Sequence, residues 1–192
     1  MRKKESKILD KLDEWQTLNA SYLKEIKHMA EKTRELNTMQ IIGYFTYSFN
    51  IQHKSNGENI CIGNFHILNA GGRSLSNPYI CIKISNTAPF TFSGKYVYKD
   101  SKQKLKLSNA WERINGPEDR EEFWLKPVDV HTLEPSETLV FSNFQLKWEA
   151  GSSYTGGIMG YIYGDEIQGG INAFNQINIS GKVSSEGESD DK

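Results

Sequence analysis

The histidines and cysteines are the residues of this sequence best suited to hold a metal ion or to act as acid and base. The four histidines lie far apart, at positions 28, 53, 66 and 131. None lies two or four residues from another, the spacings that bring two imidazoles to one metal ion. His131 is close enough to Asp129 in the sequence to form an acid–base pair, whereas His66, between Phe65 and Ile67, is typical of a hydrogen-bonded histidine in a sheet. The sequence therefore predicts no metal site, no cofactor and no enzymatic activity.

Cys61 and Cys81 are the two cysteines, and each lies between two isoleucines. Such surroundings are typical of thiols that act as small hydrophobic side chains in strands. A disulfide between neighbouring strands is the alternative, and it depends on an oxidising compartment. Two cysteines alone supply too few ligands for a zinc site. We expect thiols within strands, and the sequence leaves their pairing open.

The glycine-rich stretch 156–160 has the composition of a phosphate-binding loop but not its context. It has no Lys-Ser or Lys-Thr after it, and it leads into an apolar strand. Phosphate cradling by a loop depends on the N-terminus of a following helix. A nucleophile elbow and a dinucleotide-binding fingerprint are also missing from the sequence. These glycines are therefore interpreted as bends or bulges in a strand.

Aromatic residues in loops or in strands flanked by glycine form the candidate ligand-binding set. They are Trp111, Trp124, Tyr154, Tyr161 and Tyr163. Sugar-binding sandwiches stack such rings on pyranose faces and use Asn, Asp and Gln for the hydroxyl groups. The alternative is that these rings fill the core of the domain and its ends.

A run of four lysines within residues 99–106 follows Tyr96 and Tyr98, the combination of cations and aromatics that binds single-stranded nucleic acid. The chain as a whole argues against this function, because its formal net charge is −1 and residues 128–192 are acidic. Lysines that protect the edge strand of a sheet explain the run more simply. We expect no nucleic-acid partner.

Residues 6–38 are the first element that must position any of these groups, and their pattern predicts one long helix. Large or core-type residues recur with alternating steps of four and three, as at the a and d positions of a coiled coil. Asn19 and Thr33 also fall on this stripe. Its apolar members are the candidate oligomerisation or docking residues Ile8, Leu12, Trp15, Tyr22, Ile26, Met29 and Leu36. Two readings remain open: the helix self-associates as a coiled coil, or it folds back along its own β-domain.

From residue 41 the apolar period changes to two, and the composition becomes typical of strands, with 18 Ile against 7 Ala. The pattern predicts about seven or eight short strands in an antiparallel sandwich. One of them lies within 90–98 and one places Val140 and Phe144 on a single face, while residues 111–120 form a long loop. The predicted organisation is a helix at 1–40, a β-sandwich at 41–180 and an acidic disordered tail at 181–192.

Two stretches of turn residues frame these strands. The first runs Asn69-Ala70-Gly71, Leu75 and Asn77-Pro78 before the alternating Ile80, Ile82 and Ile84, and the second is Leu133-Glu134-Pro135-Ser136-Glu137-Thr138. The pattern resembles bacterial immunoglobulin-like β-sandwich modules over roughly residues 41–180. The resemblance implies a mainly β, antiparallel immunoglobulin-like sandwich with edges and end loops available for binding, and it implies no catalytic residue.

The leading hypothesis is a non-enzymatic interaction or structural protein that forms a homo-oligomer or docks on a protein partner through its helix. An adaptor, or a component of a particle, a phage or a cell surface, fits this description. The alternative is a carbohydrate-binding β-sandwich module. The sequence shows neither the apolar core of a signal peptide nor a stretch long and apolar enough to span a membrane. The default expectation is therefore a cytoplasmic location, with non-classical export or particle assembly left open.

Overall fold

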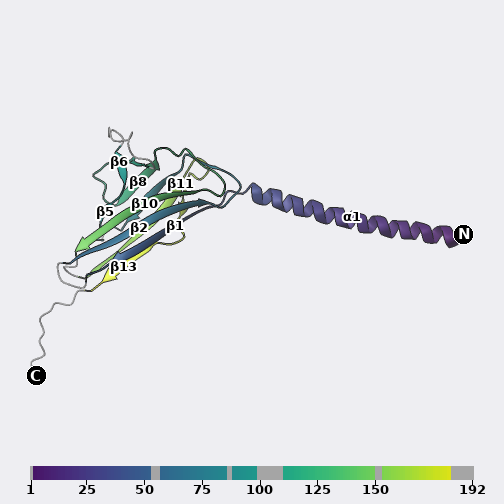
Figure 1. The fold of residues 1–192 in the computed structure, drawn as a ribbon, viewed down its shortest axis with the longest axis horizontal. Helices are drawn as coiled ribbons and strands as arrows, with labels where there is room; N and C mark the ends of the chain where they lie inside the picture. The colour runs from purple at the N-terminus through teal and green to yellow at the C-terminus, as the bar shows by residue number, and fades with distance from the viewer. Residues whose placement is uncertain (1, 53–56, 86–87, 99–109, 150–152, 183–192) are drawn as a thin grey trace, which may run out of the picture.

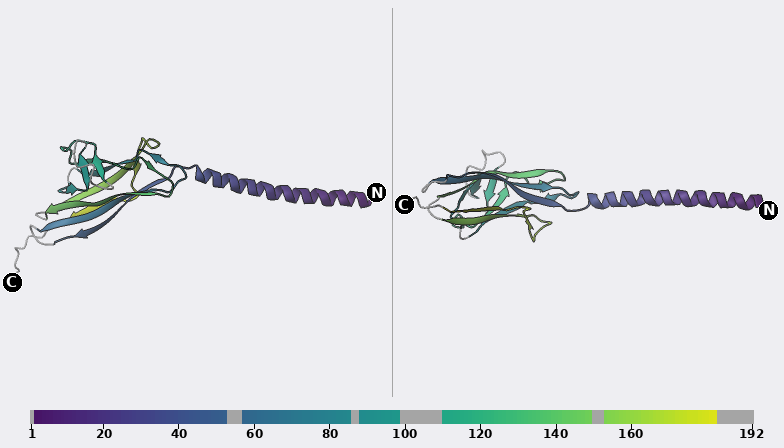
Figure 2. Two further views of the ribbon diagram at one scale, coloured as in Figure 1. Left: turned by 45° about the horizontal axis from the view of Figure 1, so that its top comes forward. Right: turned by 90° about the horizontal axis from the view of Figure 1, so that it is seen from below.

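The computed structural model describes residues 2–52, 57–85, 88–98, 110–149 and 153–182. These residues form one long helix and a β-domain built from two facing sheets (Figures 1 and 2). Helix α1 (Arg2–Leu36) is about 50 Å long at 1.5 Å per residue, and it extends away from one end of the β-domain. No Pro or Gly interrupts the sequence before residue 43, so the backbone hydrogen bonds of the helix continue over its whole length.

The first sheet has the strand order β1-β2-β10-β5, and every neighbouring pair in it is antiparallel. Its strands are β1 (Ile41–Asn50), β2 (Glu58–Asn69), β5 (Thr91–Ser93) and β10 (Thr138–Glu149). Side chains at alternate positions of a strand share a face, as the period of two in this part of the sequence predicts. Phe45 and Phe65 lie directly opposite each other in this pairing, and both are buried. Their face is one wall of the core.

The second sheet has the order β12-β11-β4-β8-β7-β6, with β13 also paired to β11. Its strands are β4 (Tyr79–Ile84), β6 (Tyr96–Tyr98), β7 (Trp111–Arg113), β8 (Glu122–Pro127), β11 (Tyr154–Tyr163), β12 (Ile171–Asn172) and β13 (Ile177–Gly181). Strands β6 and β7 run parallel. A further short pair joins β3 (Leu75–Ser76) to β9 (Thr132–Leu133).

The core lies between the two sheets and is rich in aromatic rings. Phe141 and Phe144 of the first sheet are fully buried, and the ring of Phe92 on β5 lies 4.4 Å from that of Phe123 on β8. Backbone and side chains approach closely here: a Cβ at Gly63 would lie 2.4 Å from the Phe144 ring. A position this tight accepts glycine alone without a shift of the aromatic ring.

A bulge in β10 changes which of its side chains face the core. The register between β10 and β2 shifts between Phe141 and Phe144, and Asn143 has a positive φ of 56°. Phe141 therefore occupies the core position, and Val140 lies on the outer face opposite His66. The prediction that Val140 shares a face with Phe144 is wrong, because a bulge adds one residue and inverts the alternation on one side of it.

The middle of the chain is more divided than its sequence predicts. The expected strand within 90–98 is two short strands, β5 and β6, which belong to different sheets and are separated at Gly94. The expected loop at 111–120 begins with β7, on which Trp111 is 2% exposed. Strands of three residues are too short to display a period of two, so the pattern could not reveal them.

The two turn motifs are hydrogen-bonded to each other at the end of the β-domain from which the helix leaves. The buried side chain of Asn69 donates to the backbone oxygens of Arg73 and Leu133, at 2.8 and 3.0 Å. Its Oδ1 accepts the N–H of Gly71 at 3.1 Å, and its backbone oxygen accepts the N–H of Ser136 at 2.8 Å. One buried amide thus holds together two segments that are distant in sequence.

A mainly β chain with antiparallel sheets and an N-terminal helix is confirmed. The described residues form thirteen strand segments rather than seven or eight, since several are two or three residues long. Gly181, the first residue of the predicted tail, is the last residue of β13, and residues 183–192 lie outside the described part. The immunoglobulin-like class of the sandwich stays a prediction.

Candidate functional site

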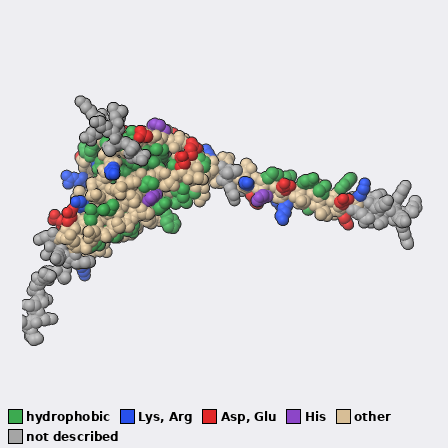
Figure 3. Space-filling model, viewed as in Figure 1, with side chains coloured by type: hydrophobic (Ala, Val, Ile, Leu, Met, Phe, Trp, Pro, Cys, Tyr) green, Lys and Arg blue, Asp and Glu red, His purple; other side chains and the backbone are tan. Residues whose placement is uncertain are grey.

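Apolar side chains lie exposed along α1, and Figure 3 shows them gathered on one side of the helix. We call this set the helix stripe. Its described members and their exposed fractions are Trp15 64%, Leu18 49%, Tyr22 54%, Leu23 60%, Ile26 56% and Met29 53%. A contiguous exposed apolar surface of this kind marks an interaction site.

The helix stripe contains four of the seven residues predicted for oligomerisation or docking: Trp15, Tyr22, Ile26 and Met29. The other three, Ile8, Leu12 and Leu36, lie within α1, but their side chains are outside the described set. Every side chain in the range 13–33 is exposed, and the helix extends away from the β-domain (Figure 1). In this range, the helix therefore does not fold back along its own β-domain.

The segment between α1 and β1 is bound to the end of the β-domain. The N–H of Ala70 donates to the oxygen of Gln40 at 2.8 Å, and the N–H of Gly72 donates to the oxygen of Thr38 at 2.9 Å. A Cβ at Gly71 would lie 2.4 Å from the Thr38 oxygen, so a side chain there would push this segment away. The last helical residue is only two positions before Thr38. These contacts leave very little free chain between the helix and the β-domain.

A second candidate site lies on the outer face of the second sheet. Tyr79 on β4 pairs with Tyr163 on β11, and Cys81 pairs with Trp124 on β8 and with Tyr161 on β11. Paired residues of neighbouring strands share a face, so all five side chains lie on the side opposite the buried isoleucines of β4.

Three of these rings touch one another, and we call Tyr79, Trp124 and Tyr163 the aromatic platform. The two tyrosine rings are stacked, with centroids 5.1 Å apart and planes 12° apart. The indole of Trp124 lies 6.1 Å from Tyr79 and 5.1 Å from Tyr163. All three side chains are half-buried. Burial raises the pKa of the Tyr163 hydroxyl, with neighbouring acidic groups adding to the effect, so Tyr163 stays a neutral donor and acceptor.

The platform covers Cys81, which is 2% exposed although it faces outward from the sheet. Burial raises the pKa of the Cys81 thiol to about 12 and that of Cys61 to about 11. Cys61 faces the core from the first sheet, where its strand partners are Phe49 and Leu146. Both cysteines are free, which agrees with the prediction that they act as small hydrophobic side chains. Neither is poised as a nucleophile, because both are buried and their pKa values are raised.

An ion pair fixes the orientation of the platform's indole. Lys83 Nζ lies 2.8 Å from Glu122 Oε1, and Trp124 Nε1 donates to Glu122 Oε2 at 3.0 Å. The hydrogen bond from Lys83, followed by that from Trp124, holds the pKa of Glu122 below its usual value. The carboxylate therefore stays ionised and keeps both partners at neutral pH. Lys83 and Glu122 lie at the rim of the platform and neutralise each other.

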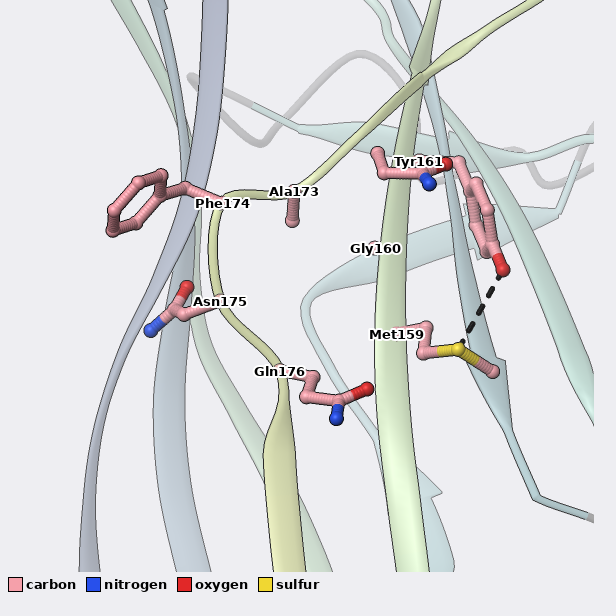
Figure 4. Close-up of a pocket in the computed structure, with 8 residues that line it drawn as sticks. Met159, Gly160, Tyr161, Ala173, Phe174, Asn175 and Gln176 are labelled. Atoms are coloured by element: carbon pink, nitrogen blue, oxygen red, sulfur yellow. Dashed lines mark hydrogen bonds between the residues drawn. The ribbon is translucent and has the colours of Figure 1, made fainter.

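A groove of about 250 Å³ continues from the platform along β11. Met159 and Tyr161 line one side of it, and residues 172–176, the end of β12 and its connection to β13, line the other (Figure 4). The Tyr161 hydroxyl lies 3.6 Å from the Met159 sulfur. Figure 4 shows Gln176 directed toward Met159, while Phe174, which is 88% exposed, turns away. We call this feature the 172–176 groove.

Asn175 fixes the far wall of the groove by binding the first sheet. Its Oδ1 accepts the N–H of Phe45 at 2.7 Å, and its Nδ2 donates to the oxygen of Phe45 at 3.0 Å. The N–H of Phe174 adds a bond to the oxygen of Gly43 at 2.7 Å. An asparagine side chain thus makes the pair of bonds that a neighbouring strand would make, and it joins the two sheets at this edge.

The five aromatic candidates do not form one site. Trp124, Tyr161 and Tyr163 share the outer face of the second sheet, as a ligand surface requires. The structure contradicts a surface role for Trp111, which is buried with its ring 5.4 Å from that of Phe141. Tyr154 lies on the opposite face of β11 and packs against Trp148, at 5.8 Å between ring centroids. Both positions agree with the alternative prediction, in which these rings fill the core of the domain and its ends.

His66 is a hydrogen-bonded sheet histidine, as predicted. Its Nε2 lies 2.9 Å from Thr46 Oγ1, and its ring stacks on Tyr44 at 4.7 Å. Burial lowers the pKa of His66, so its neutral form is favoured. His131 and Asp129, which are close in the sequence, both have exposed side chains.

Within the described residues, no group of three or more His, Cys, Asp or Glu side chains has the arrangement of a metal site. Among the described residues, no helix is long and apolar enough to cross a membrane. The lysine run at 99–106 lies outside the described residues, so the expectation of no nucleic-acid partner stays a prediction.

Tyr79, Phe174 and Asn175 are among the residues of the second site that sequence reasoning missed. Tyr79 carries a recognisable signal, because it shares the odd-numbered face of its strand with Cys81. Phe174 and Asn175 gave none, since they interrupt what reads as one continuous strand from 171 to 179. A break between two strands whose own side chain bonds to the backbone of another sheet leaves no local pattern in the sequence.

The chain matches no model of a known protein family, and no curated protein matches it. A solved structure described as "AvmM Catalyzes Macrocyclization in Alchivemycin A Biosynthesis" aligns with a TM-score of 0.36 and 9% sequence identity. The alignment covers 79% of this chain and 93% of that one. A likeness at this level carries no argument about the fold, the activity or the ligands of this chain.

Proposed function

We propose that this chain is a non-enzymatic interaction protein that self-associates through the helix stripe and presents its β-domain as a binding surface. The observation that carries the proposal is the row of apolar side chains at heptad spacing, half to two-thirds exposed along α1. Burial of one such side chain stabilises an assembly by roughly 1.5–3 kcal/mol. Residues 38–40 are hydrogen-bonded to the end of the β-domain and leave little free chain for the helix to turn back onto that domain. We therefore propose that the partner is a second copy of the chain.

The polar residues of the stripe favour a parallel assembly in register. Asn19 and Thr33 occupy a-type positions: Asn19 lies between the apolar layers of Trp15 and Tyr22, and Thr33 follows the layer of Met29. In a parallel arrangement each Asn19 meets the Asn19 of another copy, where the amides form hydrogen bonds with each other. A shifted or antiparallel arrangement would place these amides against apolar side chains, at the cost of an unsatisfied buried polar group.

The width of the stripe favours a bundle of at least three helices. A two-stranded coiled coil buries a narrow seam of a and d positions, whereas a wider apolar face suits a bundle. Leu18 and Leu23, at the flanking g and e positions, are as exposed as the a and d residues. Trp15 and Tyr22 at d positions are also bulky for a two-stranded seam. Three or more copies would enclose all of these side chains.

A parallel bundle places all of the β-domains at the same end. Each copy would then present the same face, and several weak contacts to one target would act together. This arrangement suits an adaptor or a component of a particle or surface assembly. An immunoglobulin-like sandwich, with its edges and end loops free, is the β-domain class that we propose for it.

Cross-linking through an introduced cysteine tests this proposal. In a parallel assembly, Tyr22→Cys brings identical residues of two copies together at a d position. The matched control is Lys24→Cys, two residues away at an f position on the outside of the bundle. The two native thiols are buried with raised pKa values, so they do not compete under mild oxidation near neutral pH.

The proposal predicts that oxidised Tyr22→Cys migrates as a covalent dimer in a denaturing, non-reducing gel, and that Lys24→Cys remains monomeric. Equal cross-linking of the two variants would indicate random collision and contradict the assembly. Absence of cross-linking in both would contradict a parallel arrangement in register.

A further inference from the structure

We infer that the aromatic platform and the 172–176 groove form one binding site for a neutral oligosaccharide. The inference rests on the proposed function, in which the β-domain is the part presented to a target, and it names the chemical class of that target. It is carried by the way strands β4, β8 and β11 bring aromatic rings and a closed ion pair to one face of the second sheet, beside the amides of residues 172 and 176.

The platform supplies the apolar half of sugar recognition. One face of a pyranose ring carries C–H groups, and these pack on the electron-rich face of an indole or phenol ring. Trp124 is held in place by its bond to Glu122, and contact with Tyr79 and Tyr163 restricts it further. A surface fixed in advance loses little conformational entropy when a ligand binds.

The groove supplies the polar half. Asn172 and Gln176 are exposed along it, and each amide carries donors and an acceptor suited to a pair of neighbouring hydroxyl groups. Tyr161 lines the groove from the same strand as Tyr163, and its hydroxyl, 3.6 Å from the Met159 sulfur, adds a further polar group. The backbone bonds made by Asn175 keep this wall in position.

The charges of the site favour a neutral ligand. Lys83 Nζ lies 2.8 Å from Glu122 Oε1, and the two charges neutralise each other. The groove itself is lined by Met, Gly, Tyr, Asn, Ala, Phe and Gln, with no charged residue among them. A phosphate or an acidic chain needs a cation free to pair with it. Uncharged hydroxyl groups need only the amides and phenols that are present.

The dimensions fit a short chain of sugars better than a single ring. Met159 and Tyr163 bound the site along β11, and four residues of antiparallel strand span about 14 Å. Tyr161 lies midway between them and faces the same side. A linear oligosaccharide lying along β11 would contact the platform at one end and the groove at the other.

The test begins with the full chain on an array of neutral oligosaccharides, followed by NMR titration with soluble maltotriose, cellotriose and chitotriose. The readout is the indole N–H signal of Trp124, assigned with a Trp124→Phe variant. We expect binding on the array, and a shift of this signal with the oligosaccharide that corresponds to the array hit. Asn172→Ala and Gln176→Ala each truncate an exposed side chain, so they test the site without endangering the fold.

The inference predicts that Tyr163→Ala weakens binding by about tenfold or more, since it removes a stacking ring. Gln176→Ala should weaken it several-fold. The matched control Tyr47→Ala removes an exposed tyrosine of the first sheet and should leave binding unchanged. An array without hits, or equal binding by Tyr163→Ala and Tyr47→Ala, would overturn the inference. Binding to a glycoprotein mixture that survives enzymatic removal of its glycans would assign the face to protein partners instead.

Failure of this inference is distinguishable from failure of the proposed self-association. A variant with a disrupted helix stripe, Ile26→Asp, should lose apparent affinity on the array, where several sites act together, and keep its affinity per site in the NMR titration. Equal array binding by Ile26→Asp and the parent chain would contradict the assembly while leaving the sugar site intact.

Discussion

Replacement of Asn175 by alanine tests the claim that one side chain joins the two sheets beside the groove. The substitution removes two hydrogen bonds, at 2.7 and 3.0 Å, from the backbone N–H and oxygen of Phe45. Phe45 is 3% exposed, so solvent has restricted access to the backbone groups left behind. The bond from the N–H of Phe174 to Gly43 remains, because it depends on the backbone alone.

The expected loss of stability follows from these bonds. Each contributes roughly 0.5–1.5 kcal/mol net, so Asn175→Ala should lower the free energy of unfolding by about 2 kcal/mol. For a domain of this size that corresponds to a fall in Tm of about 4–8 °C. Asn175→Asp keeps the acceptor for the Phe45 N–H but places an anion against the Phe45 oxygen. It should therefore destabilise the domain as well, through repulsion at one of the two bonds.

Urea denaturation followed by circular dichroism measures the effect, at one fixed protein concentration because self-association raises apparent stability. The matched control is Asn178→Ala, an exposed asparagine on β13 three residues away, which should change stability by less than about 0.5 kcal/mol. Equal urea midpoints for Asn175→Ala and the parent chain would refute the account of this edge. So would an equal loss in Asn178→Ala.

Three further predictions follow from the packing and the charges. Gly63→Ala should destabilise the domain by about 1–3 kcal/mol in the same urea assay, because its Cβ would lie 2.4 Å from the Phe144 ring; an unchanged midpoint would show that the ring moves freely. Cys81 should resist a thiol reagent below pH 9, since it is 2% exposed with a pKa of about 12, and Trp124→Ala should speed its labelling; equal labelling rates would contradict cover by the indole. The pKa of Glu122 lies below its usual value of 4.5, so its bond to the indole should persist at neutral pH and be lost as acid titrates the carboxylate in the folded protein. The indole N–H signal of Trp124 should therefore move with a midpoint below pH 4.5, and a midpoint above that value would contradict the assigned bond.

The sequence predicts the parts of the molecule that are governed by a regular period. A helix needs only repeated apolar spacing and the absence of Pro and Gly, and α1 (Arg2–Leu36) agrees with the predicted 6–38. The alternation in β1 and β4 likewise identified their buried faces, as the full burial of Ile80 and Ile82 shows. Periodicity works here because each side chain's direction is set by its own strand.

The same reasoning fails where a partner strand decides the outcome. The bulge at Asn143 placed Val140 on the outer face, and nothing in the local alternation reveals an inserted residue. The residues next to Trp111 in the sequence are typical of a loop, yet the pairing of β7 with β8 buries its side chain. The second candidate site depends on such pairings, since the stacking of Tyr79 on Tyr163 follows from the register of β4 with β11.

The central claim, self-association through the helix stripe, is tested most directly by the solution mass of the full chain. Light scattering behind size exclusion should give at least three times the chain mass of 21.9 kDa. Ile26→Asp, which places a charge in the stripe, should reduce the mass to that of one chain. The control Ala20→Asp puts the same charge at a b position and costs at least as much helix propensity, so it should keep the parent's mass. A parent chain that remains at 21.9 kDa at every concentration, or an Ile26→Asp variant that keeps the assembled mass, would contradict the account.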